Sequence, residues 1–260
     1  MLILRKVVLV VGGAKGIGGE VVEQVSEFFE DIVVLDYNKN ALEQSKNKML
    51  EKGKKIHTYH IDIRDRKKVQ SIVQQVENEI GAIQALIHVA GVLHEGNLCD
   101  LEEQEWDDMF DINVKGVFNV TQAVSRMMKE RKEGVIVTVG SNAASVPRLG
   151  IGAYGASKAA TIMYMKSLGL ELAPYNIRCN IVSPGSTYTD MQTSLWTDES
   201  SEQKVIEGNL ENYKVGIPLR KIAKPSDIVG VILFLISEYS NHITMSNIVV
   251  DGGATLGANA

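Results

Sequence analysis

Two side chains in the middle of the chain have types and spacing suited to proton transfer. Tyr154 and Lys158 stand four residues apart in a stretch that predicts a helix, so both lie on one helix face. A phenol with a pKa near ~10 is a poor base at neutral pH, but a neighbouring ammonium group favours the phenolate and lowers that pKa. We therefore expect Tyr154 to exchange a proton with a substrate hydroxyl group.

A serine joins this pair from an earlier segment. Ser141 stands 13 residues before Tyr154, at the end of an apolar run that predicts a strand. Ligands of open parallel sheets bind at the carboxyl ends of the strands. We expect Ser141 to hydrogen-bond the reacting oxygen and Lys158 also to hold a cofactor ribose. An isolated Tyr-x-x-x-Lys pair is usually a helix surface, but the serine and a nucleotide motif upstream argue against that here.

The nucleotide motif is the glycine-rich segment Gly12-Gly13-Ala14-Lys15-Gly16-Ile17-Gly18, which follows the first apolar run and opens into a helix. Glycine lets the backbone turn sharply and approach a diphosphate, and the helix N-terminus offers free N–H groups. A P-loop is excluded because no Gly-Lys-Ser/Thr follows. The segment predicts a dinucleotide site, although a purely structural turn would also explain the glycines.

The dinucleotide is expected to be NAD because of an acid on the next strand. Asp36 ends the second apolar run, 18 positions after Gly18, where a carboxylate accepts both ribose hydroxyls of NAD and repels the extra phosphate of NADP. Tyr37 follows, and no arginine is adjacent to attract that phosphate. Lys15 is the opposite indication, since it could reach the phosphate. A strand-end turn residue is the alternative interpretation of Asp36.

Composition excludes several other classes of protein. The chain has 260 residues, 45% of them hydrophobic, and its 27 basic and 32 acidic residues give a net charge of −5, which argues against nucleic-acid binding. No apolar run approaches the roughly 20 residues of a membrane span, and the first six residues lack the order of a secretory signal. Cys99 and Cys179 show neither metal-type spacing nor a disulfide framework. We expect a cytoplasmic protein with no metal and no nucleic-acid or membrane partner.

Strand-like and helix-like stretches alternate along the whole chain, which predicts a doubly wound α/β fold with parallel strands and helices on both faces. The seven expected strands are Lys6–Val11, Ile32–Asp36, Ile56–Ile61, Gln84–Val89, Gly134–Gly140, Ile177–Ser183 and Ile248–Val250. The expected helices are Gly16–Phe29, Asn40–Glu51, Asp65–Glu79, Glu105–Lys132, Gly152–Ala173 and Ser226–Ser237. Without a linker or repeat, residues 1–260 read as one Rossmann domain. The polar stretch 187–213 is expected to form a lid over the substrate.

These motifs together resemble the short-chain dehydrogenase/reductase family nearly from end to end. The resemblance implies a catalytic Asn113 that holds a helix kink and a water linking Lys158 to solvent. It also implies adenine contacts at Asp62 and Ile63 and a nicotinamide contact at Thr189. The resemblance also implies that Tyr154 and Lys158 contact the cofactor, as do Ile17, Ala90, Gly91, Pro184, Gly185 and Thr187. The assembly that it implies is a homotetramer.

Two positions depart from the family pattern. Val11 stands where a Thr or Ser is common, so the glycine loop lacks one bracing hydroxyl. His88 stands where the Asn of an Asn-x-Ala-Gly motif is expected, and its imidazole would replace part of that hydrogen bonding or alter the cofactor pocket. Neither change removes a proton-transfer group, so weaker NAD binding is the largest effect expected.

Segments in the second half carry a narrower resemblance, to family members that oxidise a carboxylated cyclohexadiene diol to the catechol used in siderophores. They are residues 141–148, 178–187, 189–192, 216–219, 242–245 and 250–257. Arg148 would pair with the substrate carboxylate, or else be a solvated loop residue. Met191, Gln192 and Trp196 would add contacts beside Ser141 and Tyr154. Two alternatives remain, another alcohol dehydrogenase or 3-oxoacyl-thioester reductase, and an NAD-sensing regulator without activity.

Overall fold

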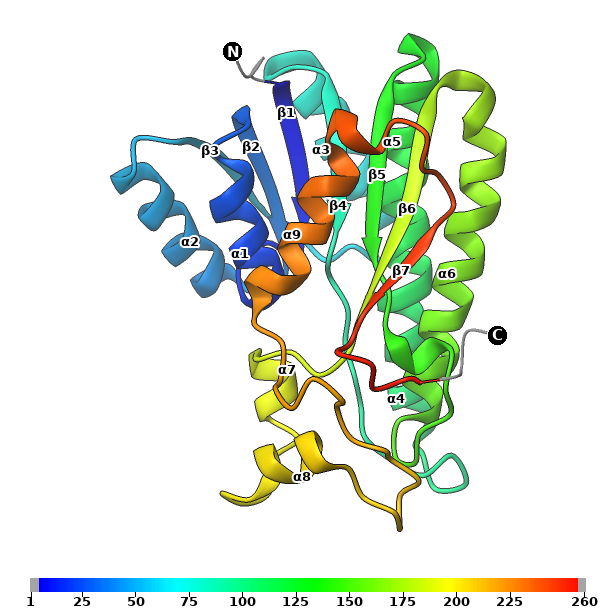
Figure 1. Ribbon diagram of the computed structural model, residues 1–260. Coiled ribbons are helices and arrows are strands. Elements are labelled where there is room, and N and C mark those ends of the chain that lie inside the picture. Colours follow the sequence, from blue (N-terminus) through cyan, green and yellow to red (C-terminus); the bar gives the residue numbers. More distant parts are fainter. Residues whose placement is uncertain (1–4, 257–260) are drawn as a thin grey trace.

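The computed structural model describes residues 5–256 and contains a seven-stranded sheet (Figure 1). The prediction that the first six residues carry no secretory signal falls partly on residues 1–4, which lie outside the described residues. The last residue of the segment 250–257 also lies outside them. All neighbouring strands pair in parallel, in the order β3-β2-β1-β4-β5-β6-β7. Their bounds are β1 Arg5–Val11, β2 Phe29–Asp36, β3 Lys55–His60, β4 Ile83–His88, β5 Gly134–Val139, β6 Ile177–Pro184 and β7 Asn247–Val250.

Helices cover both faces of the sheet, as alternation predicts. One face carries α1 (Gly16–Val25), α2 (Lys39–Glu51) and α9 (Pro225–Ile236), which pack against residues such as Val8 and Val10 of β1. The other face carries α3 (Arg66–Glu79), α5 (Val117–Arg131) and α6 (Gly152–Leu172), which pack against Val7, Leu9 and Val11 of the same strand. Successive residues of β1 thus enter opposite cores, and the fold class predicted from the sequence is confirmed.

Two expected helices differ from the observed ones. The first ends at Val25 rather than Phe29, because Phe29 begins β2 and pairs with Arg5. The predicted helix 105–132 is divided into α4 (Glu103–Phe110), a π-helical turn (Asp111–Gly116) and α5. A wide turn adds only one residue to an otherwise continuous helical pattern, and composition alone does not show where that residue lies.

The predicted lid stands apart from the two helical layers. It contains the short helices α7 (Asp190–Thr193) and α8 (Ser201–Glu207), which lie beyond the carboxyl ends of the strands (Figure 1). An antiparallel bridge between Asn209 and Lys214 follows α8. No helix among residues 5–256 is both long and apolar enough to cross a membrane.

Candidate active site

One cavity of about 720 Å³ opens at the carboxyl ends of the strands and collects most of the predicted site residues. Three predicted residues, Gly18, Asn113 and Trp196, are not among the described residues that line the cavity. Trp196 packs edge-on against Tyr188 and does not form the predicted wall. The predicted residues that line the cavity are Gly12, Lys15, Gly16, Ile17, Asp36, Tyr37, Asp62, Ile63, Ala90, Gly91, Ser141, Arg148, Tyr154, Lys158, Pro184, Gly185, Thr187, Thr189, Met191 and Gln192.

The glycine loop between β1 and α1 shows why only glycine serves there. Gly12 has φ +76°, and a Cβ on it would lie 2.6 Å from the Ala90 main-chain nitrogen. A Cβ on Gly18 would lie 1.9 Å from the Gly12 carbonyl oxygen. The loop is therefore a bare backbone surface at a helix N-terminus, and that surface fits the diphosphate of a dinucleotide. Val11, the first departure from the family pattern, is fully buried.

Asp36 is fixed beside this loop. Its Oδ2 accepts a hydrogen bond from the Ala14 main-chain nitrogen at 2.9 Å, and its Oδ1 accepts one from the Asn38 nitrogen at 2.8 Å. Lys15, which could have served a ribose phosphate, instead forms a 3.2 Å ion pair with Asp190 of α7. The carboxylate at the end of β2 is thus fixed beside the glycine loop, where its charge disfavours a phosphate.

A charged cluster after β3 includes two residues that the sequence reasoning missed. Arg64 donates to both carboxylate oxygens of Asp62 at 2.7–3.1 Å and to Asp108 of α4 at 2.9 Å. These hydrogen bonds from Arg64 lower the pKa of Asp62. The position of Arg64, two residues after Asp62 at a strand end, is a signal that could have found it. Asp108 offers no such local signal.

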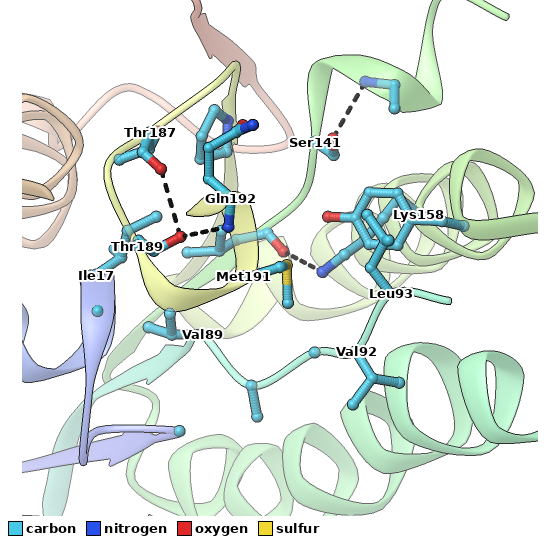
Figure 2. A pocket seen from close by; sticks show the side chains of 18 of the residues that line it. Ile17, Val89, Val92, Leu93, Ser141, Lys158, Thr187, Thr189, Met191 and Gln192 are labelled. Atoms are coloured by element: carbon cyan, nitrogen blue, oxygen red, sulfur yellow. Dashed lines mark hydrogen bonds between the residues drawn. The ribbon is translucent and has the colours of Figure 1, made fainter. Parts of the chain in front are cut away.

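Ser141, Tyr154 and Lys158 come together as the sequence predicts, and Figure 2 shows Ser141 and Lys158 at one side of the cavity. The Ser141 Oγ accepts a hydrogen bond from the Ala143 nitrogen at 3.1 Å. The Lys158 Nζ donates to the Val139 carbonyl oxygen at 3.1 Å and lies 5.8 Å from the centroid of the Tyr154 ring. A hydroxyl, a phenol and an amine therefore share one buried corner between β5 and α6.

The pKa shifts in this corner correct one expectation. Burial raises the pKa of Tyr154 above its ordinary value, and the hydrogen bond with Ser141 offsets this only in part. Burial also lowers the pKa of Lys158 to about 8. The predicted lowering of the Tyr154 pKa by the ammonium group is wrong for this arrangement, because removal from water disfavours both charged forms.

Asn113 lies in the π-helical turn and braces the catalytic corner from behind. Its side-chain Oδ1 accepts a hydrogen bond from the Val92 nitrogen at 2.8 Å, and its Nδ2 donates to the Val92 carbonyl and to the Ser157 hydroxyl. Its carbonyl oxygen accepts a 2.6 Å hydrogen bond from Thr161. Asn113 thus ties α6 to the loop that follows β4, and it lies in an irregular helical turn.

His88 does not replace the hydrogen bonds of the expected asparagine. Its side chain is buried at the end of β4, and neither ring nitrogen has a partner within the described residues. Burial, together with the charge of Lys158, lowers the pKa of His88 to about 3. The ring is therefore neutral at physiological pH. His88 is not among the described residues that line the cavity, so the second alternative, an altered cofactor pocket, stays a prediction.

The other end of the cavity is formed by the loop after Ser141 and by the predicted lid. Thr189 caps α7 by accepting a hydrogen bond from the Gln192 nitrogen at 3.4 Å and donates to the Thr187 carbonyl. Figure 2 shows the Met191 side chain pointing into the space before Lys158, while Gln192 extends away from it. Arg148 lines this end and is partly buried, with its Nε lacking a partner. Lys214, missed by the sequence reasoning, also lines it, and no local motif announces it.

Comparisons with known proteins agree with this geometry. A model of the short chain dehydrogenase family matches residues 6–200. The chain is 50% identical to the 2,3-dihydro-2,3-dihydroxybenzoate dehydrogenase of Bacillus subtilis (strain 168), over 97% of each chain. It is 41% identical to the vibriobactin-specific 2,3-dihydro-2,3-dihydroxybenzoate dehydrogenase of Vibrio cholerae, over 98% of each chain. A 7α-hydroxysteroid dehydrogenase solved with NADH superposes with a TM-score of 0.88 at 26% identity, over 97% of this chain and 96% of that one.

Proposed function

This chain belongs to the short chain dehydrogenases, and from that premise we propose that it oxidises 2,3-dihydro-2,3-dihydroxybenzoate to 2,3-dihydroxybenzoate with NAD. The observation that carries the proposal is the meeting of Ser141, Tyr154 and Lys158 in one cavity with the glycine loop and Asp36. Relatives that share 41–50% of their residues with this chain bear the name of this activity. The vibriobactin-specific relative supports a role for the product in siderophore biosynthesis.

The residues at the corner between β5 and α6 would handle the proton of the reaction. Ser141 would hold the substrate hydroxyl, and Tyr154 Oη would remove its proton, with the hydrogen bond between Ser141 and Tyr154 partly offsetting the effect of burial on the Tyr154 pKa. NAD supplies the acceptor for the hydride that leaves the same carbon. The resulting ring ketone tautomerises to an aromatic catechol, and aromatisation drives an oxidation that is otherwise unfavourable near neutral pH.

The residues that would hold NAD follow the carboxyl ends of the first four strands and β6. Gly12, Gly16 and Ile17 would form the diphosphate surface, with Gly18 packed against Gly12 behind it and Asp36 at the adenine ribose. Asp62 and Ile63 would meet the adenine. The residues assigned to the remainder of the cofactor are Lys15, Tyr37, Ala90, Gly91, Tyr154, Lys158, Pro184, Gly185, Thr187 and Thr189.

The substrate carries a carboxylate, for which Arg148 is the proposed partner, with Met191 and Gln192 as neighbouring contacts. The segment 187–213 would act as the lid. Arg148→Met should raise the KM for the substrate about tenfold or more and leave the KM for NAD unchanged. An unchanged substrate KM would return Arg148 to the role of a loop residue.

The assembly proposed is a homotetramer, which works in the cytoplasm and acts on a small-molecule substrate. Exposed apolar side chains on α6, Met163 and Leu170, support association of copies of the chain. Light scattering should give about four times the 28.5 kDa mass of one chain. A mass of one chain would refute the assembly.

The activity is tested by following NADH formation after the pure protein is mixed with NAD and 2,3-dihydro-2,3-dihydroxybenzoate. Chromatography should identify 2,3-dihydroxybenzoate as the product. Absence of turnover, together with tight NAD binding, would discard this substrate. A screen of other alcohols, and of 3-oxoacyl thioesters with NADPH, would then follow.

A further inference from the structure

Besides the catalytic Lys158, two basic side chains line the cavity without an ionic partner among residues 5–256. Arg148 comes from the loop between Ser141 and α6, and Lys214 comes from the segment that follows α8. Within residues 5–256, none of the ion pairs includes either side chain. A cation withdrawn from water without a counter-charge is costly, so this end of the cavity favours an anionic ligand.

Two acids act on these cations through their charge, but neither forms an ion pair with them among the described residues. Asp251 influences Arg148, but its carboxylate already accepts hydrogen bonds from the Thr255 hydroxyl at 2.6 Å, from Asn142 Nδ2 at 3.2 Å and from the Gly253 nitrogen at 2.9 Å. Glu95 influences Lys214 but is exposed to solvent. Burial and the charge of Arg148 both lower the pKa of Lys214, so the positive charge of Arg148 acts on the Lys214 ammonium group.

Lys214 is held in place by backbone contacts rather than by its own side chain. Its nitrogen and its carbonyl oxygen both bond to Asn209, at 2.8 Å each. Gly208 and Gly216 flank this bridge with φ +89° and +80°, and a Cβ on Gly208 would lie 2.4 Å from the Lys214 carbonyl oxygen. This backbone clasp positions the Lys214 side chain at the cavity while leaving its ammonium group free for a ligand.

We propose that Lys214 and Arg148 form a two-cation site that binds the substrate carboxylate from two separate segments of the chain. The site rests on the proposed function, because it supplies the carboxylate recognition which that function requires. Arg148 offers planar paired donors, and Lys214 adds a point charge from the far side of the lid. Lys214 is therefore a specificity-determining residue that selects a carboxylated ring over its uncharged counterpart.

The test compares two ligands that differ only in the carboxylate. Binding of 2,3-dihydroxybenzoate and of catechol to the NADH-saturated enzyme would be measured by calorimetry for the native chain, Lys214→Met, Lys214→Arg and Lys204→Met. Lys204 is the matched control, since it is an exposed lysine of α8 paired with Asp198 outside the cavity. Lys214→Met should weaken 2,3-dihydroxybenzoate about tenfold or more and leave catechol unchanged. Lys214→Arg should retain most of the affinity.

The outcomes separate the site from the activity. Equal losses for both ligands in Lys214→Met, or no loss for either, would overturn the two-cation site. If the native enzyme oxidises the diol while Lys214→Met keeps its preference for the carboxylate, the function stands and the site fails. If the carboxylate preference depends on Lys214 but the diol is not oxidised, the site stands and the proposed function fails.

Discussion

The two ends of the cavity are built on different principles. The nucleotide end is formed by the segments that follow β1, β2 and β3. Its glycine loop after β1 presents backbone, with Gly12 and Gly18 packed so closely that no side chain fits. The substrate end, formed by residues 141–151 and 187–217, presents side chains from segments far apart in the sequence. Arg148 and Lys214 meet there although 66 residues separate them.

The difference shows where a binding site is constrained and where it is adaptable. A backbone surface recognises what all dinucleotides share, and almost any substitution damages it. A side-chain surface recognises one substrate, and single residues change it without disturbing the strands beneath. Substitutions at the nucleotide end should therefore weaken NAD binding, whereas substitutions at the substrate end should change substrate recognition or turnover.

The largest expected effect separates chemistry from nucleotide binding. Tyr154→Phe removes the proton acceptor but keeps the buried ring, so turnover should fall by ~10²–10⁴-fold. NAD binding, measured by fluorescence titration, should stay within about twofold because the glycine loop is untouched. Turnover within tenfold of the native enzyme would show that another group accepts the proton.

A substitution at the nucleotide end should have the opposite signature. Gly12→Ala combines a positive φ with a contact of 2.6 Å to Ala90, and strain of about 1–3 kcal/mol should weaken NAD binding by roughly 10–100-fold. Gly53→Ala is the matched control, because Gly53 has φ +69° but nothing within 4 Å of its Cβ position. It should lose some stability and keep its affinity for NAD. Equal NAD affinities in the two variants would contradict the role of close approach at Gly12.

The buried His88 side chain should make the free energy of unfolding depend on pH. Its pKa is about 3 in the folded chain and near 6.5 when unfolded, so the unfolded chain binds the extra proton between these values. The free energy of unfolding should therefore decrease as pH falls from 6.5 toward 3, by up to about 1.4 kcal/mol per pH unit from this residue. His88→Asn removes that contribution.

Urea unfolding at several pH values between 4 and 7 checks this expectation. The His88→Asn curve should be flatter than that of the native chain. His242→Asn, at an exposed position, should run parallel to the native curve. Parallel curves for both variants would mean that His88 does not carry the acid sensitivity.

The smallest expected effect concerns the contact that joins the two ends. Lys15 of the glycine loop pairs with Asp190 of α7, but both side chains are more than half exposed. Exposed pairs contribute about 0–1 kcal/mol, so Asp190→Asn should change the KM for NAD by about fivefold at most, and less at high salt. A larger, salt-independent change would show that α7 is part of the rigid nucleotide end.

The nucleotide end could be predicted from the sequence because its requirements are written in residue types. Gly12, Gly18 and Asp36 occupy positions where few other residues function, and each follows a strand that its apolar run reveals. Tyr154 and Lys158 were equally visible, since helical spacing alone places them on one face. The pKa of Tyr154 could not be predicted in this way, because the burial of its side chain depends on how α6 packs and not on the residues next to it in the sequence.

Fewer contacts at the substrate end could be predicted from the sequence, for a physical reason. Lys214 and Arg148 line one cavity and interact through their charges, although no local pattern links their segments. The Arg64–Asp108 bridge at the nucleotide end was missed for the same reason. Trp196 was assigned to the cavity wall on its type, yet it turns toward Tyr188. Residue type indicates what a side chain can do, whereas its partner depends on the path of irregular segments.

The π-helical turn at Asp111–Gly116 also sets a phase relation along the chain. A wide turn holds one residue more than an α-helical turn, and each residue of an α-helix rotates the face by about 100°. The wide turn absorbs the extra residue, so the inward stripe of α5, which includes Val120 and Val124, keeps facing the sheet. The turn therefore acts as a spacer, which brings Asn113 to the main chain of Val92 without rotating the helix that follows.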